Sequence, residues 1–455
     1  MDLVRATTQL FASAREFPVR LWDGTVLAPS RPSNVRGALV LATPRALDAL
    51  LPPTTELRLA EAFLDGDIEL EGDAIGVIEA AMRWEGPRPG AGTLWAVVKL
   101  AARRALSQLA RRPDIDARLH GRTHSQGRDR RAVQHHYDVS DDFYRLFLDD
   151  QMVYSCAAFA PGADTLEEAQ RAKLELVCRK LELEKGERFL DVGCGWGALV
   201  AHATAHHGAT AVGITLSENQ LAEARRRVAS GAPGASIRAA DYRQLDGERF
   251  HKIASVGMME HVGRARLPEY FRALHRLLHP GGLLLNHAIA DISTDRPALR
   301  WTSRRGGGFI DRYIFPDGDL VPIGMVLAAA ERAGFEVRDV ESLREHYADT
   351  CAAWLERLER RWDEAERLVG RRRARAYRLY LASSSAQFRV GRISIFQVLL
   401  AKPDERGRVQ GVPRWRGEWY ERALLPNPNP ASRAREPGPV AHDPRTEIGP
   451  GAGQG

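Results

Sequence analysis

The alternation of short apolar runs with helical segments between residues 187 and 290 constrains the fold of this protein most. The apolar runs read RFLDVG, TAVGIT, SIRAAD, KIASVG and GGLLLNHAIA. Helical patterns stand between them: SENQLAEARRRVAS follows the second run and RLPEYFRALHRLL precedes the last. Strands and helices that alternate at this spacing predict an α/β fold with a doubly wound, mostly parallel sheet.

A chain of 455 residues is long enough for two or three domains. Residues 1–90 mix strand-like runs (FPVRLWDGTVLA) with a helical pattern (LRLAEAFLDGDIELEGDAIGVIEAAMRW), and they predict a small α+β domain. Residues 91–130 form a basic connector, and residues 131–425 carry the regular α/β pattern. Residues 426–455 hold seven Pro, five Gly and no aromatic residue, which predicts a disordered tail.

The connector is strongly basic. Residues 99–131 contain ten Lys or Arg against three Asp, and the segment TLWAVVKLAARRALSQLARR has an amphipathic helical pattern. Such a segment suits a solvated linker, an anionic membrane surface or a nucleic acid. Nucleic acid is the least favoured partner, because no recognised nucleic-acid-binding motif accompanies the charge.

Cellular location and metal content are constrained by what the sequence lacks. The N-terminus does not have the basic-then-apolar layout of a secretory signal, and no run approaches the ~18–20 apolar residues of a spanning helix. Four cysteines occur without a CxxC pair or a Cys/His cluster in the sequence, which argues against a disulfide framework and structural zinc. We therefore expect a cytoplasmic protein without a metal.

The loop LDVGCGWGAL at residues 190–199 lies where the first strand of the α/β pattern turns into a helix. Gly193, Gly195 and Gly197 let the backbone pass close to a ligand, and a helix N-terminus favours anionic groups. The loop also satisfies the G-x-G-x-x-A pattern, so a dinucleotide is one candidate ligand. Asp191, two residues before the first glycine, is typical of S-adenosylmethionine-dependent methyltransferases.

The ends of the next two strands separate these candidates. The second strand ends in GITLS, which offers the hydroxyls of Thr215 and Ser217 and not the acid that usually meets an NAD ribose. The third ends in ADYR, where Asp241 and Tyr242 suit the edge and face of an adenine. Both features favour S-adenosylmethionine over a nicotinamide or flavin cofactor.

Four motifs in series carry a resemblance to a known family. They read VQHHYDVSDDFYRLFLDDQMVYSCAAF, TLEEAQRAKLELVCRKLELEKGERFLDVGCGWG, SVGMMEHVG and RYIFPDGDLVP. Over residues 131–402 the sequence resembles the cyclopropane-fatty-acyl-phospholipid synthases and the related mycolic acid cyclopropane synthases. Residues 1–130 resemble, more loosely, the extra N-terminal domain of the bacterial phospholipid-acting enzymes.

This resemblance implies a Rossmann-like methyltransferase sheet and an enzyme that uses S-adenosylmethionine. The methyl carbon would be added across a cis double bond of an unsaturated phospholipid acyl group, with bound bicarbonate as the base. The resemblance also implies a homodimer. Together with the basic connector, it suggests an enzyme peripheral to the inner face of the membrane, with an anionic phospholipid surface as partner.

The family pattern assigns site residues one position at a time. The resemblance implies bicarbonate-holding catalytic positions at Cys156, Glu260, His287, Ile289 and Tyr347. It places the cofactor site at Tyr154, Ser155, Asp191, Gly193, Gly195, Gly197, Thr215, Leu216, Ser217, Gln220, Asp241 and Tyr242. A reactive thiolate beside a sulfonium would itself be methylated, so we expect Cys156 to be a neutral thiol that contributes its backbone.

One position departs from the family pattern. Many family members carry a cysteine where this sequence has Ser384. Loss of that thiol leaves open a related outcome, in which a fatty-acyl methyltransferase forms a methylene branch in place of a ring. Retention of His287 favours cyclopropanation, because enzymes of the branching type tend to lack that histidine.

Overall fold

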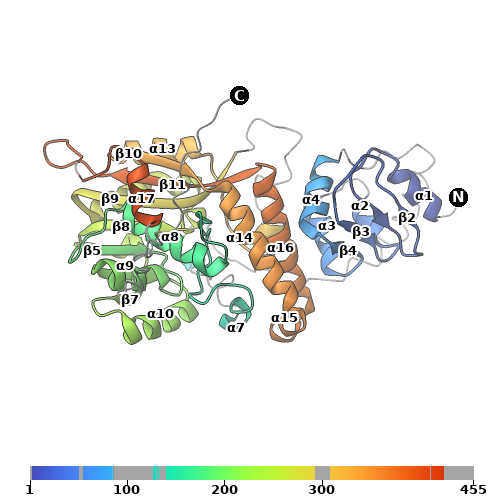
Figure 1. Ribbon diagram of the computed structural model, residues 1–455, viewed down its shortest axis with the longest axis horizontal. Helices are drawn as coiled ribbons and strands as arrows, with labels where there is room; N and C mark the ends of the chain where they lie inside the picture. The colour runs from blue at the N-terminus through green and yellow to red at the C-terminus, as the bar shows by residue number, and fades with distance from the viewer. Residues whose placement is uncertain are drawn as a thin grey trace, which may run out of the picture.

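The computed structural model describes residues 3–50, 55–84, 86, 127–129, 131–132, 140–292, 308–409 and 411–424. Most of the connector predicted at 91–130, including its amphipathic helix, and the whole tail predicted at 426–455 lie outside these residues. A large sheet and a small one lie at opposite ends of the molecule, and a layer of long helices stands between them (Figure 1).

The large sheet has seven strands in the order β10-β11-β9-β8-β5-β6-β7. Its strands are β5 (Arg188–Val192), β6 (Thr210–Thr215), β7 (Ser236–Ala239), β8 (Phe250–Val256), β9 (Leu278–Asp291), β10 (Glu336–Ser342) and β11 (Ile393–Ala401). Strands β5 to β9 pair in parallel, whereas β11 pairs antiparallel with both β9 and β10. The predicted doubly wound, mostly parallel sheet is confirmed.

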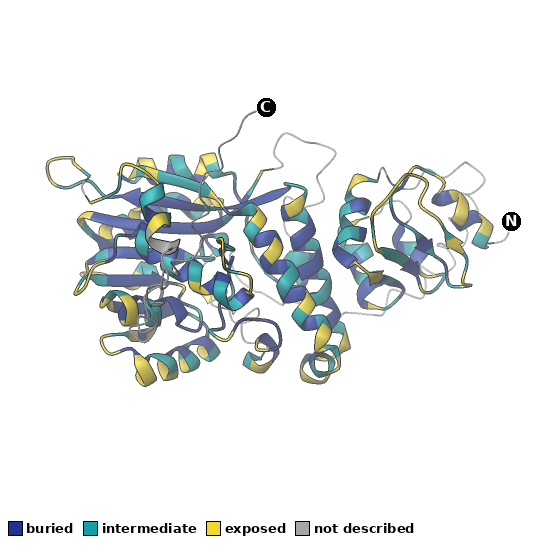
Figure 2. Cartoon of the chain, in the orientation of Figure 1, coloured by how far each residue is buried: buried dark blue, intermediate teal, exposed yellow. Residues whose placement is uncertain are grey.

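Helices cover both faces of this sheet. Those around it are α8 (Leu166–Lys180), α9 (Ala198–His207), α10 (Glu218–Gly231), α11 (Leu267–Leu277), α13 (Ile323–Arg332) and α17 (Gly417–Leu424). Alternate strand residues enter different apolar clusters: Phe189 packs with α8 and α9, whereas Leu190 packs with α11 and α13. The strands inside the sheet are accordingly buried, the edge strands β7 and β10 are mostly not, and the helices expose mainly their outer faces (Figure 2).

The small sheet belongs to the N-terminal part of the protein and has the order β2-β1-β3-β4. Its elements are α1 (Leu3–Leu10), β1 (Val19–Arg20), β2 (Val26–Leu27), β3 (Gly37–Leu41), α2 (Ala46–Leu50), α3 (Glu56–Leu64), β4 (Ile68–Gly72) and α4 (Ala74–Arg83). A continuous helical pattern from residue 57 to 84 is therefore wrong. Ile68 and Leu70 are buried while Glu71 is exposed, and this period-2 alternation between Gly66 and Gly72 makes a strand.

The helical layer between the sheets joins the two ends of the molecule. It consists mainly of α14 (Arg344–Arg360), α15 (Trp362–Val369) and α16 (Arg371–Arg389), with the short α12 (Phe309–Tyr313) and α7 (Asp141–Tyr144) beside it. One apolar cluster runs from Phe17 and Phe63 at the N-terminal end to Trp354 and Tyr377 in this layer. The N-terminal domain therefore shares a core with α14 and α16.

Arg375 on α16 is a buried polar link across this contact. Its Nε donates to the carbonyl of Phe63 at 2.7 Å, and its Nη1 lies 2.7 Å from a carboxylate oxygen of Glu69. The guanidinium also stands 4.3 Å from the ring centroid of Phe63. Only 5% of Arg375 is exposed, and it also donates to the carbonyl of Ile68, so the carbonyls of the buried residues Phe63 and Ile68 would lose a hydrogen bond without gaining water.

Among the described residues, no helix combines the length and the apolar character that crossing a bilayer requires.

We predict that Arg375→Met lowers the free energy of unfolding by about 2 kcal/mol, because the backbone carbonyls of Phe63 and Ile68, both buried residues, lose their donor. Urea unfolding followed by circular dichroism measures the change. Arg371→Met is the matched control: Arg371 is mostly exposed and lies 3.8 Å from Glu366, so its loss should change stability by less than about 0.5 kcal/mol. Equal effects of the two changes would contradict the assignment.

Candidate active site

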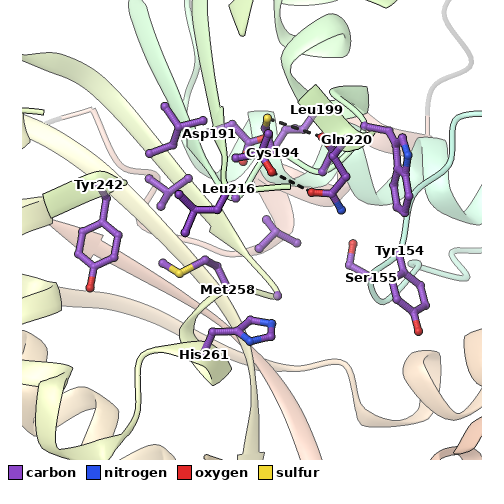
Figure 3. Close-up of a pocket in the computed structure, with 18 of the residues that line it drawn as sticks. Tyr154, Ser155, Asp191, Cys194, Leu199, Leu216, Gln220, Tyr242, Met258 and His261 are labelled. Carbon is purple, nitrogen blue, oxygen red and sulfur yellow. Dashed lines mark hydrogen bonds between the residues drawn. The ribbon is translucent and has the colours of Figure 1, made fainter. Parts of the chain in front are cut away.

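A cleft opens at the carboxyl ends of β5, β6, β7 and β8, the edge at which open α/β sheets bind ligands (Figure 3). It encloses about 1220 Å³ of empty space, including its open mouth. The predicted cofactor residues that line it are Tyr154, Ser155, Asp191, Gly193, Gly195, Thr215, Leu216, Gln220, Asp241 and Tyr242. In Figure 3, Tyr154 and Ser155 stand at one side of the cleft and Tyr242 at the other.

The glycine loop forms the floor of the cleft after β5. Gly193 and Gly195 have positive φ values of 78° and 53°, which glycine adopts readily. A Cβ at Gly195 would meet no protein atom within 4 Å, so the backbone there is open to a ligand. Gly197 has a different role, because it precedes α9 and a Cβ there would lie 3.1 Å from that of Ala224. It permits helix packing and does not line the cleft.

The turn after β6 orients a side-chain amide. The hydroxyl of Thr215 donates to Oε1 of Gln220 at 2.9 Å and accepts from the backbone N–H of Ser217 at 3.2 Å. Ser217 caps α10 by accepting from the backbone N–H of Gln220. Ser217 therefore stabilises the turn but does not line the cleft. Gln220 does line it, and its amide nitrogen can donate to a ligand.

The loop after β7 presents both predicted residues, but the acid is already paired. Asp241 accepts from Nη2 of Arg243 at 2.6 Å, and the same guanidinium reaches Asp129 at 3.0 Å. Burial raises the pKa of the Tyr242 phenol, which is therefore neutral. Arg243 and Asp129 line the cleft as well, although the sequence analysis gave them no role.

Lys173 is the most consequential residue that the sequence analysis missed. This lysine on α8 is buried, lines the cleft and donates from Nζ to the hydroxyl of Ser155 at 3.0 Å. Burial lowers its pKa to about 8, and burial raises the pKa of Asp191 to about 7 against the charge of Lys173. The lysine lies inside a quoted motif, but an isolated Lys in a helical pattern usually indicates an exposed face.

Tyr154 joins the cleft to an aromatic cluster. Its ring centroid lies 5.2 Å from those of both Tyr144 and Trp354, and Tyr144 in turn lies 5.2 Å from Trp196. Burial and the neighbouring Tyr380 phenol raise the pKa of Tyr154, so it is neutral. These rings form an apolar wall with few charges next to the cofactor cleft.

The predicted catalytic residues do not line this cleft and lie in the interior beyond it. Glu260 follows β8, and its Oε1 accepts from the backbone N–H of Ile289 on β9 at 2.8 Å. Burial raises the pKa of Glu260 to about 7, and its Oε2 is buried without a hydrogen-bond partner among the described residues. The N–H of Ile289 is thus already committed to a protein carboxylate.

His287 lies two residues before Ile289 on β9, with its side chain on the same face. It is fully buried, and its Nδ1 lies 3.1 Å from Nε2 of Gln397. Burial lowers the pKa of the imidazole, so the ring is neutral, and its Nε2 has no partner in the described part of the protein. The carbonyl of His287 accepts from the N–H of Gly257, which lines the cleft, at 2.8 Å.

Cys156 and Tyr347 are the other two predicted catalytic residues in the interior. Together with Glu260, His287 and Ile289 they form the group called the interior set below. The Cys156 thiol is fully buried and donates to the carbonyl of Ala157 at 3.2 Å. Burial raises its pKa well above the ordinary value, as expected of a neutral thiol. Burial, with Tyr380, Cys351, Cys156 and Glu260 nearby, likewise raises the pKa of Tyr347. The Cys156 thiol and the backbone N–H of Tyr347 both reach the carbonyl of Leu343, at 3.7 Å and 3.0 Å, so these two residues are neighbours.

Ser384, the departure from the family pattern, is buried on α16 one turn after Tyr380. It therefore lies within the helical layer and does not line the cofactor cleft.

Comparison with known proteins identifies the family. The family described as mycolic acid cyclopropane synthetase matches residues 124–398. A probable fatty acid methyltransferase of Pseudomonas putida is 39% identical over 88% of this chain and 95% of its own length. A cyclopropane mycolic acid synthase 1 of Mycobacterium tuberculosis is 39% identical, but over 59% of this chain and 96% of its own.

Solved structures match the same region. Mycolic acid cyclopropane synthase CmaA1, complexed with SAH and CTAB, is 38% identical with a TM-score of 0.58, over 60% of this chain and 98% of that protein. Cyclopropane synthase MmaA2 from Mycobacterium tuberculosis is 37% identical with a TM-score of 0.57 over similar shares. The glycine loop, the cleft beside it and these matches agree, and the protein belongs to the mycolic acid cyclopropane synthetase family of S-adenosylmethionine-dependent methyltransferases.

Proposed function

We propose that this enzyme forms cyclopropane rings on unsaturated phospholipid acyl groups. The family transfers one carbon to lipids, as a ring or as a branch, and the choice between them depends on which proton is lost. The observation that carries the proposal is the buried interior set, in which Glu260 Oε2 and His287 Nε2 have no partner among the described residues. Buried polar atoms without partners are rare in proteins, and a bound anion would give these two atoms a partner.

S-adenosylmethionine would supply a methyl group activated by its sulfonium. The open backbone at Gly195 and the amide nitrogen of Gln220 suit its amino-acid and ribose parts. Tyr242 offers a neutral ring for the adenine. Asp241 is paired with Arg243, so that pair, and not an isolated carboxylate, would meet the adenine edge.

The proposed reaction balances without a redox partner. The two π electrons of the alkene form a bond to the methyl carbon, and the carbon–sulfur bond breaks with its electrons remaining on sulfur. A positive charge is left on the second alkene carbon. A C–H bond of the transferred carbon then supplies the electrons for the third ring bond as its proton leaves. The apolar aromatic wall around Tyr154 would keep water from trapping the cation.

The residues of the interior set fit a small anion that can accept this proton. Neutral His287, with Gln397 as donor to Nδ1, carries its proton on the unpartnered Nε2, and the Tyr347 phenol is a second donor. Glu260 has a raised pKa of about 7, so it can hold a proton and donate as well. Bicarbonate, the ion that the family resemblance implies, would supply the base.

Methylene-branch formation is the second candidate, and two observations favour it. The relatives that match nearly the whole protein are named probable fatty acid methyltransferases, whereas the cyclopropane synthases match only the catalytic part. Ser384 also replaces a thiol that many family members carry. The same first bond would form, and the proton would leave an acyl carbon beside the cation.

We further propose that the basic connector brings the enzyme to an anionic membrane surface, at the inner face of the cell membrane. The charge excess over residues 99–131 supports this placement. A homodimer, which the family resemblance implies, also belongs to this proposal.

Expression in a host that lacks the activity, followed by NMR of the extracted lipids, tests the proposed function. We expect a gain of one CH₂, loss of the double bond and ring-methylene proton signals. Signals of an exocyclic methylene would establish the branching alternative. Unchanged lipids in the presence of folded enzyme that binds S-adenosylmethionine would overturn both.

We predict that Glu260→Gln abolishes turnover, at least about 100-fold, while the affinity for S-adenosylmethionine changes less than about twofold. Glutamine keeps an acceptor for the N–H of Ile289 but loses the carboxylate. Calorimetric titration and a product assay measure the two quantities. Glu356→Gln, at an exposed carboxylate paired with Arg360 away from the cleft, is the control and should change neither. An equal loss of binding and turnover would show that Glu260 serves the cofactor.

We predict that replacing Arg103, Arg104, Arg111 and Arg112 by Gln weakens binding to anionic vesicles by about 1 kcal/mol per charge. Co-sedimentation with phosphatidylglycerol vesicles at two salt concentrations measures it, with neutral phosphatidylcholine vesicles as control. Unchanged binding would show that the connector is a solvated linker without a role in membrane binding.

A further inference from the structure

We propose a second site in this enzyme: a binding site for a zinc-class divalent cation where α8 packs against α9. Cys178, His202 and His207 each offer a ligand atom, and these three atoms lie within 4.8 Å of one another. Glu175, whose carboxylate contacts both histidines, lies outside the group that shares this spacing and is an additional oxygen ligand beside it. None of the four residues lines the cofactor cleft.

The two helices bring the ligands together. Glu175 and Cys178 are three residues apart on α8, so their side chains share one face of that helix. His202 and His207 lie in the last two turns of α9, which packs on the same face. A shared apolar cluster that contains Val177, Cys178 and Ala203 holds the helices in contact. The site is therefore built on rigid elements.

The spacing of the polar atoms suits a tetrahedral cation. Oε2 of Glu175 lies 2.9 Å from Nε2 of His202 and 3.1 Å from Nε2 of His207. Zinc–nitrogen and zinc–oxygen bonds of about 2.0–2.1 Å place neighbouring tetrahedral ligands ~3.3 Å apart. The carboxylate and both imidazoles thus already stand at nearly the ligand-to-ligand distance, and small side-chain rotations would admit a cation between them.

The thiol is the feature that a plain ion pair does not explain. A network of Glu175 with two histidines and Arg179 would be complete without sulfur. Cys178 is nevertheless fully buried, with its Sγ within 4.8 Å of a ring nitrogen of each histidine.

The chemistry of the ligands selects the class of cation. One thiolate and two imidazoles favour Zn²⁺ and similar borderline metals over Mg²⁺ or Ca²⁺, which prefer oxygen. The histidine side chains are 11% and 17% exposed, which gives an entry path from solvent. Binding forms a sulfur–metal bond and releases the thiol proton to solvent, with no change of oxidation state.

Such a cation would tie together two helices that frame the cofactor cleft. In the turns before Glu175, α8 carries Lys173 and Gln170, which hold Ser155 and the carbonyl of Val153. The other helix, α9, begins directly after the glycine loop. The proposal therefore assigns the metal a structural role in the catalytic domain, outside the reacting centre.

Cobalt binding to the full-length protein tests the site directly. After treatment with a chelator and dialysis under reducing conditions, Co²⁺ should bind at about one ion per protein molecule. It should give the near-ultraviolet absorption of a thiolate–cobalt bond and the intense visible bands of tetrahedral Co²⁺. Zn²⁺ should displace it and raise the melting temperature, because it binds the folded state. Wild-type protein without a thiolate–cobalt band would overturn the proposal.

Matched variants identify the ligands. Cys178→Ser should remove the thiolate–cobalt band, and His207→Ala should lower the affinity for Zn²⁺ at least about 100-fold. His206→Ala is the control, because the His206 ring contacts that of His202, with centroids 4.5 Å apart and planes tilted by 39°, but is exposed and outside the set. The site is refuted if the band persists in Cys178→Ser, or if the control loses affinity as much as His207→Ala does.

Discussion

The buried polar side chains of α8 are the interaction on which the rest of the catalytic half depends. Gln170 donates to the carbonyls of Val153 and Ser155, and Lys173 donates to the Ser155 hydroxyl. Fully buried Lys180 pairs with Asp339 and Glu341 on β10, a strand at the far edge of the sheet. Lys180 needs its carboxylate partners, because an unpaired charge in the interior costs several kcal/mol. One helix therefore holds both the segment around Ser155 in the cleft wall and the edge strand β10.

The site divides into two environments with different physical tasks. The cleft over the glycine loop is polar and open, as binding of a charged, water-soluble cofactor requires. The set around Glu260, His287 and Tyr347 is buried, and burial keeps its groups neutral or nearly so by moving their pKa values. Gly257 touches both regions, since it lines the cleft and donates to the carbonyl of His287. The backbone of Gly257 therefore connects the cofactor cleft to the interior set.

The N-terminal domain is integrated with the catalytic part. Its apolar residues continue into α14 and α16, and Arg375 closes the contact with hydrogen bonds to α3 and to β4. The same helices carry Tyr347, Trp354 and Tyr377 of the interior. The domain contact and the aromatic wall are therefore built on the same two helices. The shorter relatives match only the catalytic part of the protein, so this arrangement concerns the longer members.

The sequence by itself determined the class of sheet, the glycine loop and most of the cleft lining. Strand alternation, glycine spacing and family motifs are local signals that can be read without coordinates. The tertiary structure decided what local signals cannot carry. Gly197 and Ser217 do not line the cleft, because Gly197 allows close helix packing and Ser217 caps α10. Lys173 does line it, because the face of α8 that carries this residue points inward. Cys178 and His207 lie on different helices, so only the packing of α8 on α9 brings them together. Proximity between distant residues follows from burial of apolar faces, and spacing along the sequence does not record it.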